Sequence, residues 1–177
     1  MRILIIALPR TGSKVFTKWL STELGYKEYV EPNRMENIEG IEGDNVVVKW
    51  DSWEMDPIVA EGDWDKVILL SRENTYDQSI SLVRARERGD TWWVGSQYTI
   101  TREWIKRNGI EIGLRKEYLD NEREKLNRYN GIPITYEGIY HTGEHRETLR
   151  TELGIPSWKY LDIIGMDKRY RKDIKLI

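Results

Sequence analysis

Short, unbroken runs of apolar residues alternate along the chain with longer segments in which apolar positions recur every three or four residues. The clearest runs span residues 3–8, 46–48 and 67–70. Runs of this kind are typical of parallel strands that helices cover on both faces. The pattern predicts strands at residues 2–7, 46–50, 66–70 and 131–136, and helices at residues 12–24, 76–88, 110–129 and 143–153. We therefore expect an α/β fold with a central, mainly parallel sheet flanked by helices.

The composition narrows the class of protein. The 177 residues are most simply one domain, residues 1–177, and 33% of them are charged, yet the net charge is only −2. This balance lacks the basic excess of nucleic-acid-binding proteins, so we expect no nucleic-acid partner. The absence of cysteine excludes disulfides and thiolate catalysis, and it fits a cytoplasmic protein. No apolar run approaches the ~20 residues of a membrane helix, so we expect no membrane span.

A short basic turn, Pro9-Arg10-Thr11-Gly12-Ser13-Lys14, joins the first predicted strand to its helix. Such a turn aims backbone N–H groups and a helix N-terminus at one point, which attracts an anion. Glycine and serine can also serve turn geometry alone, but the basic side chains and hydroxyls gathered here favour anion binding. The turn is not a Walker A loop, G-x-x-x-x-G-K-[ST], because Ala7 stands at the first glycine and Ser13 separates Gly12 from Lys14.

The turn resembles the 5′-phosphosulfate loop of sulfotransferases, which use 3′-phosphoadenosine 5′-phosphosulfate (PAPS) as donor. A second segment, residues 72–85 followed by Gly89 and Trp92, is similar to the 3′-phosphate motif of that family. Its form, Gln-x-x-Ser-Leu-x-x-Ala, looks most like bacterial sulfotransferases that act on carbohydrates such as trehalose. The resemblance implies a P-loop-like three-layer fold and transfer of a sulfuryl group from PAPS to a hydroxyl of a carbohydrate or other small acceptor, with no metal required.

The resemblance also implies a role for each residue of the turn. Arg10 would stabilise the leaving 5′-phosphate in an in-line transfer. The same phosphate would be cradled by Thr11, Gly12, Ser13 and Lys14.

In the second segment, Arg72 and a serine of the following helix would hold the 3′-phosphate. The family places the two residues eight apart, whereas Ser81 lies nine and Ser79 seven residues after Arg72. The alignment of the residues around it favours Ser81. Two basic residues of the C-terminal segment, Arg171 and Lys172, either reach back to this phosphate, as in related enzymes, or form a solvated end.

The general base is expected to be a carboxylate. Residues 25–32 resemble the Glu-Tyr-Phe-x-Pro segment of the bacterial group, in which a glutamate is the base. That points to Glu28, with Glu31 second, whereas His141 and His145 do not fall where the family places its base. Candidates for binding the acceptor or stacking on a ring are Lys49, Trp53 and Trp92.

Two other hypotheses stay open. A nucleotide or small-molecule kinase of P-loop type would need Mg²⁺ ligands and a Walker-type lysine, which the turn fits poorly. A non-catalytic nucleotide-binding module would bind the cofactor without turnover. Because the sequence has no evident cluster of histidines and carboxylates, we expect no metal site.

Overall fold

The computed structural model describes residues 1–30, 41, 43–51, 62–87, 99–159 and 175–176. The elements follow in the order β1 (Arg2–Ala7), α1 (Ser13–Leu24), β2 (Lys27–Val30), β3 (Val46–Asp51), β4 (Lys66–Ser71), α3 (Thr75–Glu87), β5 (Thr99–Ile100), α4 (Arg102–Leu126), β6 (Ile132–Thr135), the π-helix η3 (Gly138–Thr142), α5 (Glu144–Glu152) and β7 (Lys175–Leu176). All four predicted strands and all four predicted helices are present.

Five of these strands form one sheet, in the order β2-β3-β1-β4-β6, and every pair is parallel. The chain leaves β1 for β2 and β3 on one side and returns to β4 and β6 on the other. The direction of winding therefore reverses between β1 and β4. In open α/β sheets, ligands bind beside the carboxyl ends of the strands at such a reversal. The two predicted anion motifs follow these same two strands.

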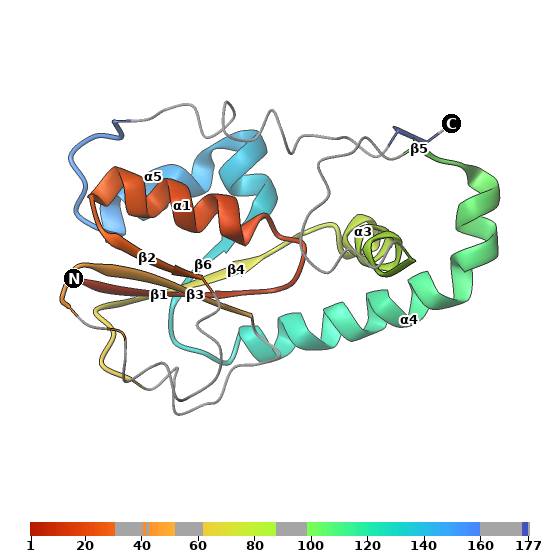
Figure 1. Ribbon diagram of the computed structural model, residues 1–177, viewed down its shortest axis with the longest axis horizontal. Helices are drawn as coiled ribbons and strands as arrows, with labels where there is room; N and C mark the ends of the chain where they lie inside the picture. The colour runs from red at the N-terminus through yellow and green to blue at the C-terminus, as the bar shows by residue number, and fades with distance from the viewer. Residues whose placement is uncertain (31–40, 42, 52–61, 88–98, 160–174, 177) are drawn as a thin grey trace.

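Helices cover both faces of the sheet and make three layers (Figure 1). On one face, Ile5, Val47 and Ile68 pack with Phe16 and Trp19 of α1, and α5 and η3 complete the cover. On the other face, alternate strand residues such as Leu4, Ile6 and Val48 pack against Leu126, the last residue of α4. The strands β1, β3 and β4 are buried on both sides, which is why they read as unbroken apolar runs in the sequence.

Helix α3 begins directly after β4 and packs on α4 (Figure 1). Asn74 caps it, because its side-chain oxygen accepts a hydrogen bond from the Asp77 amide at 3.0 Å. At the other end, Trp104 of α4 donates to Glu87 at 2.8 Å and lies under the Arg84 guanidinium. The contacts of Trp104 hold the last turn of α3 against the first turn of α4.

Two elements differ from the prediction. The edge strand β2, Lys27–Val30, was not predicted, because its half-exposed residues show no unbroken apolar run. Helix α4 begins at Arg102 rather than at residue 110, since Thr101 caps it and Trp104 packs against α3 despite the glycines at 109 and 113. In the part of the chain that the structure describes, no helix combines the length and apolarity that crossing a bilayer requires.

Candidate functional site

The turn after β1 has a specialised backbone. Arg10 has φ 62° and Gly12 has φ 70°, both in the left-handed region. For a residue other than glycine this conformation costs on the order of 1–3 kcal/mol, and residues held in it cluster at functional sites. The buried Thr11 hydroxyl donates to the Leu8 carbonyl at 2.7 Å and holds the turn from within. Helix α1 starts immediately afterwards, with the Phe16 amide bonded to the Gly12 carbonyl, so the positive end of its dipole lies at the turn.

Two tyrosine rings line the turn at Gly12. A Cβ atom added there would lie 3.2 Å from Tyr140 Cε2 and 3.3 Å from Tyr136 Cε2. The Tyr140 hydroxyl donates to the Gly12 carbonyl at 3.0 Å, and the two ring centroids are 4.7 Å apart. The positive φ and the approach of the rings therefore both favour glycine at this position. Both tyrosines come from the segment that follows β6.

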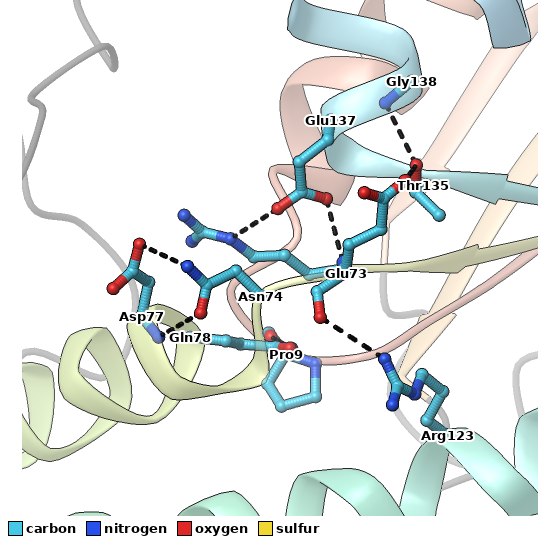
Figure 2. Close-up of polar contacts among 10 residues, drawn as sticks. Pro9, Glu73, Asn74, Asp77, Gln78, Arg123, Thr135, Glu137 and Gly138 are labelled. Atoms are coloured by element: carbon cyan, nitrogen blue, oxygen red, sulfur yellow. Dashed lines mark hydrogen bonds and ion pairs between the residues drawn. The ribbon is translucent and has the colours of Figure 1, made fainter.

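The second predicted motif begins at the end of β4. The Arg72 Nε donates to Glu137 Oε1 at 3.3 Å, and its guanidinium carbon lies 4.8 Å from the centre of the Tyr136 ring. Figure 2 shows the Glu137 carboxylate reaching from the segment after β6 to the Glu73 amide, which donates to Oε2 at 2.9 Å. The Arg72 side chain is thus bound on one edge and on one face, and it shares the Tyr136 ring with the turn after β1.

Two contacts join the motifs to each other. Gln78 of α3 is fully buried, and its amide nitrogen donates to the Pro9 carbonyl at 2.5 Å (Figure 2). The Arg10 Nε donates to Ser81 Oγ at 3.1 Å. The structure therefore brings together the turn after β1, the end of β4 and the first turns of α3, at the point where the winding of the sheet reverses.

The two candidate serines of α3 have different surroundings. Ser79 is fully buried, and its hydroxyl donates to the Tyr76 carbonyl within the same helix at 2.6 Å. Ser81 is only partly buried and lies against Arg10. Of the two, Ser81 is the serine that faces the turn.

A buried ion pair lies at the same edge of the sheet. Lys49 Nζ and Asp51 Oδ1 are 2.6 Å apart, and their side chains are 2% and 9% exposed. Asp51 is in register with Ala7, two residues before Pro9. The Asp51 carboxylate was not predicted as a site residue, although a charged residue directly after a buried strand is a usable signal. Lys49, by contrast, was predicted to lie on the acceptor side.

The charge of Asp51 also reaches helix α4. Burial raises the pKa of the Tyr118 hydroxyl, the charges of Glu122 and Asp51 raise it further, and Arg115 opposes them. This places a phenol of α4 within electrostatic range of the buried ion pair.

The predicted base Glu28 lies elsewhere. It is exposed, pairs in register with Val47 near the amino end of β3, and accepts a hydrogen bond from Ser21 at 3.3 Å. Asp51 is four positions further along β3, which at ~3.3 Å per residue is about 13 Å away. The structure does not bring Glu28 to the turn. Five other predicted residues lie outside the described residues: Glu31, Trp53, Trp92, Arg171 and Lys172.

The two histidines contact residues near the site, Thr135 and Tyr136, and neither lies where a general base was expected. His145 Nδ1 accepts a hydrogen bond from the Thr135 amide at the end of β6, at 2.9 Å, and His141 packs edge-on to Tyr136. Among the residues that the structure describes, no group of three histidines, aspartates or glutamates is arranged to hold a metal ion.

Comparisons with known proteins agree with the architecture. No protein-family model and no curated protein sequence matches the chain. The fold is similar to that of a crystal structure of mouse sulfotransferase SULT7A1 complexed with PAP, with a TM-score of 0.62 at 15% sequence identity. The match covers 94% of this chain, which spans 62% of the mouse chain. The chain therefore has the fold of a sulfotransferase, a P-loop-like α/β fold with a parallel five-stranded sheet between layers of helices. This confirms the predicted fold class, a mainly parallel sheet flanked by helices.

Proposed function

We propose that this protein is a sulfotransferase that uses PAPS as donor and a hydroxyl of a carbohydrate or other small molecule as acceptor. The observation that carries the proposal is the junction of two basic motifs, made by the Arg10–Ser81 and Gln78–Pro9 hydrogen bonds. PAPS carries phosphate groups at both ends of its ribose, so it needs two anion sites side by side. The fold neighbour complexed with PAP supports the same conclusion.

The residues at the junction fit a ligand with two phosphate groups. The turn after β1 offers Arg10, Lys14 and the N-terminus of α1, and its glycine leaves no side chain in the way of the rings that line it. We assign this half to the 5′-phosphosulfate. Arg72 and Ser81 take the 3′-phosphate, because a guanidinium offers a planar pair of donors to such a group. We also propose that Arg171 and Lys172 reach this phosphate from the C-terminal segment.

When bound, PAPS supplies the sulfuryl group. The bond that breaks joins sulfur to the 5′-phosphate oxygen, and the bond that forms joins sulfur to the acceptor oxygen. The electron pair of the broken bond goes to the 5′-phosphate. Arg10 and Lys14 would neutralise that growing charge, which is the largest demand of an in-line transfer.

A carboxylate has to accept the proton of the acceptor hydroxyl. Asp51 suits this role better than Glu28, because its register places it beside the turn and Lys49 holds its carboxylate in place. We retain Glu31 as an alternative general base. We also propose that Lys49, Trp53 and Trp92 bind the acceptor.

Calorimetry tests the cofactor. We expect adenosine 3′,5′-bisphosphate to bind tightly without metal, and ATP with Mg²⁺ to bind weakly. Arg72→Ala should weaken bisphosphate binding about 10- to 100-fold, because a hydrogen bond to a charged group contributes ~1.5–3 kcal/mol. Arg150→Ala, on the outer surface of α5 where Arg150 pairs with Glu147, is the matched control and should bind normally.

Transfer of labelled sulfate to a panel of sugars, phenols and lipids tests the reaction. Arg10→Ala should lower kcat about 10²- to 10³-fold, more than it lowers affinity. Bisphosphate binding without any transfer would indicate a non-catalytic module, and preference for ATP with Mg²⁺ would indicate a kinase. If Arg10→Ala and Arg72→Ala both left bisphosphate binding untouched, the site assignment would be refuted.

A further inference from the structure

The Glu137 carboxylate lies in the half of the site that we assign to the 3′-phosphate. It follows β6, and it binds two groups at the end of β4: the Arg72 Nε at 3.3 Å and the Glu73 amide at 2.9 Å. The Arg72 and Glu137 side chains are each 18% exposed. A negative charge beside a proposed phosphate site needs an explanation, because it opposes the binding of an anion.

The way in which Arg72 is held suggests one. Glu137 takes the Nε edge of the guanidinium, and the Tyr136 ring covers one of its faces. Among the described residues, neither Nη group of Arg72 makes a hydrogen bond. A guanidinium offers five N–H donors in a fixed fork. With Nε bound to Glu137, the two terminal nitrogens remain as the pair of donors that an oxyanion would contact.

Glu137 is itself fixed by its neighbours, as Figure 2 shows. The Thr135 hydroxyl donates to Glu73 Oε1 at 2.9 Å and accepts from the Gly138 amide at 3.0 Å. The Thr135 amide in turn donates to His145 at 2.9 Å. The start of η3 is therefore tied to the end of β4 on both sides of Glu137, so the carboxylate can orient Arg72 rather than follow it.

We propose that Glu137 is a positioning residue that orients Arg72 and thereby gives the site its preference for a 3′-phosphate. This inference rests on the proposed function. The carboxylate reduces the side-chain entropy that Arg72 loses on binding, at the expense of some repulsion. Immobilising one side chain of this kind is worth about 0.5–1.5 kcal/mol, or roughly 2- to 10-fold in affinity.

The test compares two ligands that differ only in the 3′-phosphate: adenosine 3′,5′-bisphosphate and adenosine 5′-monophosphate. The measured quantity is the ratio of their Kd values, by calorimetry, for the wild type and for Glu137→Ala and Glu137→Gln. We expect Glu137→Ala to lower the preference for the bisphosphate roughly 2- to 10-fold while binding of the monophosphate is unchanged. Glu137→Gln keeps an oxygen acceptor for Arg72 and should retain more of the preference. Glu147→Ala, exposed on α5, is the matched control.

The outcomes separate the inference from the proposed function. If Glu137→Ala binds the bisphosphate more tightly, the carboxylate competes with the phosphate and the inference is overturned. Equal weakening of both ligands, or an unchanged ratio, also overturns it, because either result means that Glu137 acts only on the fold. A wild type that prefers the bisphosphate leaves the proposed function intact in those cases. A wild type without any preference refutes both.

Discussion

Replacing Gly12 by alanine tests how tightly the Tyr136 and Tyr140 rings restrict the turn after β1. Gly12 has φ +70°, and an added Cβ would meet two rings at 3.2 and 3.3 Å. Gly25, at the other end of the same helix, has φ +68° and nothing within 4 Å of an added Cβ. The two positions share a backbone conformation and differ in their surroundings, so Gly25→Ala is a matched control.

The magnitudes follow from this difference. Placing an alanine in the left-handed region costs about 1–2 kcal/mol in either variant. At Gly12 the Tyr136 and Tyr140 rings must also move by a few tenths of an ångström, and overpacking of this kind costs typically 1–3 kcal/mol more. We expect Gly12→Ala to lower the free energy of unfolding by about 2–5 kcal/mol and Gly25→Ala by about 1–2 kcal/mol.

Urea unfolding, followed by tryptophan fluorescence, gives both values, and bisphosphate titration of the folded variants gives the effect on the site. Gly12→Ala should weaken bisphosphate binding, because the rings and the turn shift together, whereas Gly25→Ala should leave it unchanged. Equal destabilisation by the two substitutions would mean that the rings do not restrict Gly12. Normal binding by Gly12→Ala would refute the view that the turn cradles the phosphate.

Two further predictions concern charged groups. Lys49→Met should destabilise the fold by about 3–5 kcal/mol, because it removes the Lys49 ammonium from the buried Asp51 carboxylate, and adding Asp51→Leu should recover most of that loss in urea unfolding. Hydrogen bonds from Lys116 and then Thr75 lower the pKa of Asp120 against the opposing effect of burial. Its carboxylate therefore contributes stability above its unfolded-state pKa of about 4, and this is lost as the pH falls through the lower folded-state value. Asp120→Asn should flatten the acid limb of the stability profile, and an unchanged limb would contradict this.

The fold could be predicted where burial in the tertiary structure requires a simple pattern of apolar residues in the sequence. Strands β1, β3 and β4 are covered on both faces, so each contains an unbroken run of at least three apolar residues. The edge strand β2 has two exposed and two partly buried residues and is only four residues long, which leaves too little pattern to detect. The start of α4 depends on Trp104, whose packing against α3 decides the helix boundary more than the local propensities do.

The site could be predicted only in part, for a related reason. Arg10 and Arg72 stand at junctions between a strand and the turn that follows it, and such junctions are visible in the sequence. Glu137 is 65 residues from Arg72, and its proposed role depends on β4 and β6 being neighbours in the sheet. The position of Asp51 beside the turn depends in the same way on the register between β1 and β3. Contacts between residues on strands that are distant in the sequence cannot be predicted from a single sequence.

The contacts across the junction argue that the two proposed phosphate subsites act as one rigid unit. Arg10 keeps an unfavourable φ, and such strain persists only where the surroundings fix the backbone from several sides. Here Thr11 holds the turn from within, and Gln78 and Ser81 hold Pro9 and Arg10 from α3. Because Arg72 lies in the short connection between β4 and α3, any shift of the turn would be opposed by the helix that follows the second arginine. The in-line transfer that we propose would need this rigidity, because a misplacement of about 1 Å between the reacting groups can cost on the order of 100-fold in rate.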